Sequence, residues 1–115
     1  MTPAALEAAA LGLAGAELSI KWGRDSCYCV CGKMFAATDA EGATLSLKVS
    51  DIAFEALTAT GRAKPAPYGA RFKWVQFEDL SALDAAEVSD WLIRAHALVA
   101  AKLPKSQRRT LGLAF

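Results

Sequence analysis

The chain has 115 residues, of which 54% are hydrophobic and 22% charged, and its formal net charge is +1. This length predicts a single domain covering residues 1–115, because only one shared core is available to offset the entropy lost on folding. The composition excludes a disordered chain, and the small net charge excludes nucleic-acid binding by bulk charge alone. Any such binding requires a local basic patch.

A helix is expected over residues 4–13, because Thr2 is a hydroxyl cap ahead of Pro3 and apolar residues then follow on one face. Residues 19–49 alternate apolar and polar side chains and are interrupted by glycines, which is typical of short antiparallel strands joined by tight turns. The expected strands cover residues 18–22, 27–31, 33–37 and 44–49. In the last of these, Leu45, Leu47 and Val49 share one face, so one side of the sheet meets a core and the other meets water.

The second half begins with a predicted helix over residues 51–60, which Ser50 caps and Gly61 ends. Residues 62–70 hold two prolines and a glycine and are expected to form a loop or a sheet edge, before a strand over residues 72–77. A long final helix begins at the cap Asp84 and ends before Pro104. Its apolar stripe predicts packing across one face of the sheet; the residues are Val88, Trp91, Leu92, Ala95, Leu98 and Val99.

No apolar run is long enough to span a membrane, and the N-terminal region lacks the basic flank of a secretory signal. The three cysteines, Cys27, Cys29 and Cys31, alternate along one predicted strand, where neighbours are poorly placed for a disulfide. We therefore expect a reduced, cytoplasmic protein with no membrane partner.

Five short motifs recur in an order and spacing that resemble the MmcQ/YjbR family over nearly the whole chain. They are Trp22-Gly23-Arg24, Gly32-Lys33-Met34-Phe35-Ala36, Leu45-Ser46-Leu47-Lys48, Lys73-Trp74-Val75 and the run from Leu98 to Pro104. The resemblance implies one domain of the α+β class with a CyaY-like fold, related to bacterial frataxin. In that fold an antiparallel sheet has N- and C-terminal helices packed on one face, here with a short helix after the central hairpin. DNA binding is the function it implies.

The sequence departs from the family at Asp25-Ser26-Cys27-Tyr28, where relatives tend to have Pro-Phe, and at His96, where an aromatic residue is common. Frataxin's iron chemistry does not carry over, because Glu7 is the only acidic residue of the first predicted helix and cannot form an acidic ridge by itself.

Basic residues near the predicted sheet form the candidate nucleic-acid site. If they converge on the side of the sheet that carries no helix, with Trp22, Tyr28 or Trp74 beside them, they form a surface suited to phosphates and bases. The alternative is a set of solvated lysines scattered over a polar face. The candidate residues are Lys21, Arg24, Lys33, Lys48, Arg71, Lys73 and Trp74.

Two other groups of residues are interpreted as structural. The spacing C-x-C-x-C on a strand favours small hydrophobic side chains, with metal or redox use as the alternative, because zinc sites favour C-x2-C turns. His96 stands between Ala95 and Ala97 on the long helix, which fits a partly buried packing role better than proton transfer. The sequence thus predicts no catalytic residue, metal or cofactor.

The prediction is a small non-enzymatic binding module that binds DNA through a basic sheet face. The alternative is an interaction domain that binds a protein or a small anion on the same face, with no nucleic-acid role. A second basic cluster, Lys102, Lys105, Arg108 and Arg109, either complements the C-terminal end of the last helix or acts as an arm on nucleic acid.

Overall fold

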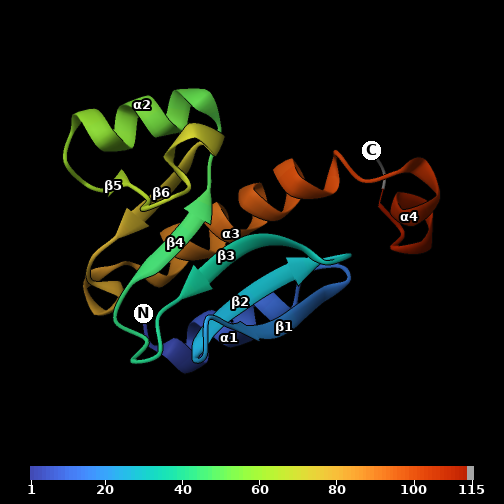
Figure 1. Cartoon of the computed structure of the whole chain (residues 1–115), viewed down its shortest axis with the longest axis horizontal. Helices are drawn as coiled ribbons and strands as arrows, with labels where there is room; N and C mark the ends of the chain where they lie inside the picture. Colours follow the sequence, from blue (N-terminus) through green and yellow to red (C-terminus); the bar gives the residue numbers. More distant parts are fainter. Residues whose placement is uncertain (114–115) are drawn as a thin grey trace.

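An antiparallel sheet of six strands forms the centre of the structure, a computed structural model that describes residues 1–113. Its order is β1-β2-β3-β4-β6-β5, so the first four strands form a meander and β6 lies between β4 and β5. Figure 1 shows α1 and α3 behind this sheet, with α2 beside β5 and β6. The strands are β1 (Ala16–Lys21), β2 (Asp25–Val30), β3 (Lys33–Thr38), β4 (Leu45–Lys48), β5 (Lys64–Pro65) and β6 (Trp74–Phe77).

Four α-helices and two short 3-10 turns complete the chain described here. They are α1 (Pro3–Leu11), α2 (Asp51–Ala59), α3 (Ala85–Ala100), α4 (Lys105–Thr110), η1 (Ala70–Phe72) and η2 (Leu80–Ala82). The predicted caps are confirmed: Thr2, Ser50 and Asp84 each accept a hydrogen bond from a backbone N–H three residues later, at 3.1 Å. No helix among residues 1–113 has both the length and the apolar character needed to cross a bilayer.

The core lies between the sheet and the helices α1 and α3. Alternation along the strands points Tyr28, Val30, Leu45, Leu47, Val75 and Phe77 toward these helices, and all of them are buried. The side chains between them point to the opposite side, which we call the helix-free face. The predicted α+β architecture, with terminal helices on one face and a short helix in mid-chain, is confirmed.

Several element boundaries differ from the prediction. Residues Lys105–Thr110 form α4, which the sequence did not indicate because these residues are polar and show no apolar stripe. Helix α3 ends at Ala100, before the predicted Leu103, because the N–H groups of Lys102 and Leu103 bond three residues back and tighten the last turn. Tyr28, expected beside the basic residues, is only 2% exposed and belongs to the core.

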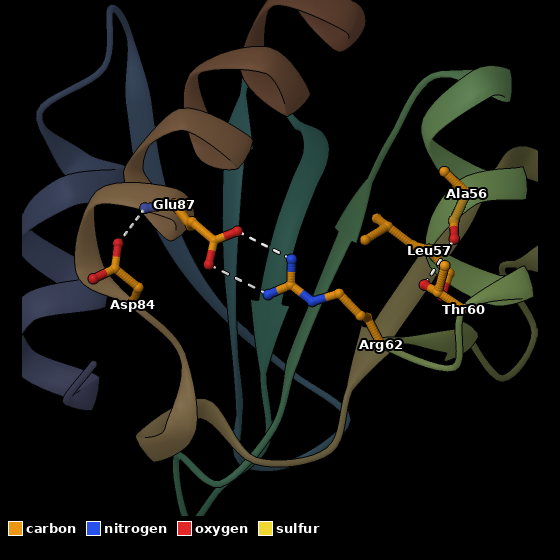
Figure 2. Close-up of polar contacts among 6 residues, drawn as sticks. All are labelled: Ala56, Leu57, Thr60, Arg62, Asp84 and Glu87. Carbon is orange, nitrogen blue, oxygen red and sulfur yellow. Dashed lines mark hydrogen bonds and ion pairs between the residues drawn. The ribbon is translucent and has the colours of Figure 1, made fainter.

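An ion pair joins the segment after α2 to the first turn of α3. Figure 2 shows Arg62 extending to Glu87, with the two guanidinium nitrogens 3.0 and 3.3 Å from the carboxylate oxygens. The same guanidinium lies 5.4 Å from the ring centre of Trp91, whose other neighbour is the stacked ring of Phe77 at 4.6 Å. These contacts link the segment after α2 to α3, although a pair this exposed adds less than about 1 kcal/mol to the free energy of unfolding.

Candidate functional site

A cleft of about 630 Å³ lies on the helix-free face. Its floor is formed by β3, β4 and β6, one wall by the β1–β2 turn, and the other by the segment between β5 and β6. The volume is in the range of small-ligand sites, and we call this feature the aromatic cleft. Its lining residues are Trp22, Asp25, Met34, Ala37, Thr38, Asp39, Thr44, Ser46, Ala66, Pro67, Tyr68, Gly69, Phe72, Trp74 and Gln76.

Four aromatic side chains line the cleft. Trp22 is 72% exposed in the β1–β2 turn, and Tyr68 and Phe72 are exposed on the opposite wall. Trp74 is half-buried at the start of β6. A Cβ atom at Gly69 would lie 3.0 Å from the Trp74 Cβ, so the small residue at this position lets the wall close against the indole. Because exposed aromatic rings gather around one concavity, the aromatic cleft is the candidate binding surface.

The floor of the cleft combines apolar side chains with polar ones, and most of the polar ones are uncharged. Gln76 donates a hydrogen bond to Ser46 Oγ at 3.3 Å, and both residues line the cleft. Asp39 has a structural role, since its Oδ1 accepts hydrogen bonds from the backbone N–H groups of Ala43 and Thr44. Within the described part of the chain, no lysine or arginine lines the cleft.

Three of the predicted basic residues flank the cleft. Lys21 ends β1 on the helix-free face, and Arg24 occupies the β1–β2 turn beside Trp22. On the opposite wall, the Arg71 guanidinium lies 4.7 Å from the ring centre of Phe72. Of the predicted site residues, Trp74 lines the cleft itself, and the nucleic-acid-binding role of all of them stays a prediction.

The other predicted basic residues point elsewhere. Lys73 places its Nζ 4.9 Å from the ring centre of Phe54 in α2, and Lys48 donates to the carbonyl of Phe72 at 2.6 Å. Lys33 is the first residue of β3, directly after the β2–β3 turn, at the other end of β2 from Arg24 and on the order of 20 Å from it. The structure therefore does not gather all six lysine and arginine side chains on one face, because turn geometry and aromatic neighbours redirect three of them.

Lys48 lines a second cavity, of about 590 Å³, which we call the α2–α3 groove. Its walls are mainly apolar and its charged members are basic. Burial, and then the charge of Lys102, lowers the pKa of Lys48, with Asp51 acting weakly in the opposite direction. The lining residues are Lys48, Val49, Ser50, Ala53, Trp91, Arg94, Ala97, Leu98, Ala101 and Lys102.

His96 and two of the cysteines are buried outside both cavities. The Nε2 of His96 lies 2.8 Å from the Ala14 carbonyl, which can only accept, so this nitrogen carries a proton. Its ring also meets Phe35 edge-on at 5.4 Å between ring centres. Burial raises the pKa of the Cys27 and Cys29 thiols, which keeps them protonated and poorly nucleophilic. Cys31 is exposed in the β2–β3 turn.

The sequence interpretation did not include Tyr68, Phe72 and Gln76 in the site. A signal was present for the first, since an aromatic residue before a glycine in a proline-rich loop, as in Tyr68-Gly69, indicates an exposed ring in a turn. The position of Gln76 depends on β6 pairing with β4, where it lies opposite Ser46. That pairing joins segments about 30 residues apart and leaves no local pattern in the sequence.

Comparisons with known proteins agree with this fold. The model of the family described as YjbR matches residues 11–98. The chain is similar to the crystal structure of Deinococcus radiodurans protein DR2400, described as having the family-model domain DUF419, with a TM-score of 0.80 and 24% identity. The match covers 94% of this chain and 86% of that one. No curated protein matches the chain.

Proposed function

The chain belongs to the YjbR family, and from its aromatic cleft we propose that it is a non-enzymatic module that binds single-stranded nucleic acid, with DNA as the expected ligand. One observation carries this proposal: Trp22, Tyr68, Phe72 and Trp74 line a single concavity on the helix-free face. Stacking of a base on an aromatic side chain contributes about 1–3 kcal/mol and tolerates any base, because every base has a π-face.

The distribution of charge supports a single strand over a duplex. In a duplex the faces of the bases are covered by their neighbours, and the protein must contact phosphates with converging cations. Here Asp25 and Asp39 line the cleft and would repel a phosphate inside it, whereas Lys21, Arg24 and Arg71 each adjoin a cleft residue in the sequence. This arrangement suits bases within the cleft and a backbone that passes over the rim.

The proposal of a non-enzymatic role is supported by the state of the potentially reactive side chains. His96 donates its Nε2 proton to a backbone carbonyl on the helix side of the sheet. Cys27 and Cys29 are buried with raised thiol pKa values. The His96 imidazole and the Cys27 and Cys29 thiols therefore do not form a hydrogen-bonded pair of nucleophile and base in the cleft.

Titration with labelled oligonucleotides across salt tests the proposal. Three phosphate contacts predict a slope of about −2 in log K against log salt for a single strand, which is an affinity loss of roughly 20-fold between 50 and 200 mM. We expect single-stranded DNA to bind more tightly than a duplex of the same length. Absence of single-strand binding at tens of micromolar protein and 50 mM salt would contradict the proposal, as would tighter binding of the duplex.

A second candidate function, binding of a small anion, is favoured by the α2–α3 groove. Lys48 and Lys102 repel each other in the lining of a mainly apolar cavity, and an anion between them would relieve that repulsion. A carboxylate with a short alkyl chain matches both properties. Calorimetric titration with decanoate should show binding that Lys48→Met weakens at least fivefold, and equal binding by both proteins would exclude the groove.

A further inference from the structure

The two edges of the sheet differ in how well they are protected against pairing. At one edge, β5 has only two residues, one of which is Pro65, and Lys64 forms an ion pair with Glu78 at 2.8 Å. Short strands, prolines and lysines are the usual means by which proteins block edge-to-edge association. At the other edge, β1 has six residues, contains no proline and, among residues 1–113, pairs with β2 alone. Its outer backbone groups are therefore free to pair with another strand.

Apolar side chains on β1 are also left uncovered. Leu18 and Ile20 lie on the helix side of the sheet, opposite Tyr28 and Ser26 of β2, and they are 40% and 57% exposed. Two neighbouring apolar side chains on an open edge strand are unfavourable in water and favour a partner.

The sequence of β1 is complementary to itself when it is reversed about Ser19. In an antiparallel pair of two β1 strands centred on this residue, Glu17 of each copy lies opposite Lys21 of the other, and Leu18 lies opposite Ile20. The charged pairs then fall on the helix-free face and the apolar pairs on the helix side, since residues two apart share a face. Neither Glu17 nor Lys21 belongs to an ion pair among residues 1–113. Opposite charges and apolar residues directly across a ladder stabilise it.

We propose that two copies of this chain associate through β1, antiparallel and in the register Glu17–Lys21, Leu18–Ile20 and Ser19–Ser19 across a two-fold axis. The two sheets become continuous, and both helical layers lie on the same side. Because the strand pairs with its own copy, the contact is isologous and closes at the dimer. The proposed dimer does not depend on nucleic-acid binding, so the two proposals are tested separately.

The charge pattern provides a direct test by sedimentation equilibrium at low salt. Glu17→Lys and Lys21→Glu each place two like-charged pairs across the axis, and we expect the dimer dissociation constant to rise at least tenfold in each variant. The double variant restores opposite charges and should return to within threefold of wild type. An equimolar mixture of the two single variants should form a heterodimer, because both facing charged pairs then carry opposite signs. Circular dichroism checks that each variant is folded.

A matched pair of variants tests the apolar contact. Ile20→Lys should abolish the dimer, whereas Ile93→Lys on α3, which replaces an isoleucine of similar exposure (54%), should leave it unchanged. A wild-type protein that stays monomeric at about 1 mM would overturn the proposal. So would a dimer whose dissociation constant is unaffected by the single charge reversals or equally affected by the two isoleucine variants.

Discussion

Trp22→Ala removes the most exposed indole of the aromatic cleft. Trp22 lies in the β1–β2 turn with φ 49°, and 72% of its surface is exposed, so its ring contributes little to the core. We therefore expect the free energy of unfolding to change by less than about 1 kcal/mol. Loss of one stacked base costs about 1–3 kcal/mol, which corresponds to a decrease in affinity of roughly 5- to 150-fold.

Fluorescence anisotropy of a labelled single-stranded 12-mer at 50 mM salt measures this effect. Trp22→Phe is the matched control, because it keeps an aromatic face in the same turn and should lose less than half of the binding energy that alanine loses. Ile93→Ala, an exposed apolar residue on α3, controls for a general effect of surface truncation. Wild-type affinity in Trp22→Ala, or equal losses in the alanine and phenylalanine variants, would refute stacking in the cleft.

Three further predictions concern stability. Burial, and next the charge of Glu7, raises the pKa of Tyr28 to about 12. Since the unfolded pKa is about 10, wild type should lose roughly 2–3 kcal/mol relative to Tyr28→Phe as the pH rises from 10 to 12, measured by urea unfolding; parallel pH profiles would contradict this. Leu92→Ala truncates a core side chain that is 1% exposed and should cost about 2–5 kcal/mol in the same assay, and a cost under about 1 kcal/mol would show that the site is not packed as described. Glu87→Gln breaks a half-exposed pair with Arg62 and should cost less than about 1 kcal/mol, and a larger cost would mean that the pair is more than a surface contact.

The architecture could be predicted from the sequence where local pattern and tertiary packing agree. The cap Asp84 and the apolar stripe of α3 specify a helix and the face that it buries, and the strand pattern from Leu45 to Val49 specifies the side that meets the core. The expected loop or edge after α2 contains β5, where Pro65 restricts pairing to the edge of the sheet.

The arrangement of the basic residues could not be predicted, because it depends on contacts between distant segments. Strand alternation places the Lys48 side chain on the other face of the sheet from Leu47, but its amine donates a hydrogen bond to the Phe72 carbonyl, 24 residues away. Lys73 has a left-handed backbone conformation, φ 63°, and its side chain contacts Phe54 in the preceding helix. Neither contact leaves a periodic signal, so the sequence identified the residue types near the site without their directions.

The position of Trp74 in the cleft depends both on the local sequence pattern and on contacts between distant segments. Its place at the start of β6 follows from the strand pattern, whereas its role as a cleft wall requires the segment from Ala66 to Phe72 to fold beside it. Gly69 permits that approach through the space it leaves near the Trp74 Cβ. Close packing of this kind is visible only in three dimensions.

The three tryptophans allow the central claim to be tested in one NMR titration. Trp22 and Trp74 line the aromatic cleft, and Trp91 lies on the other side of the sheet between Phe77 and Arg62. When a single-stranded oligonucleotide is added to the labelled protein, we predict that the indole N–H signals of Trp22 and Trp74 shift together while that of Trp91 stays in place. A titration in which only Trp91 shifts, or in which all three signals stay fixed at saturating ligand, would contradict recognition at the helix-free face.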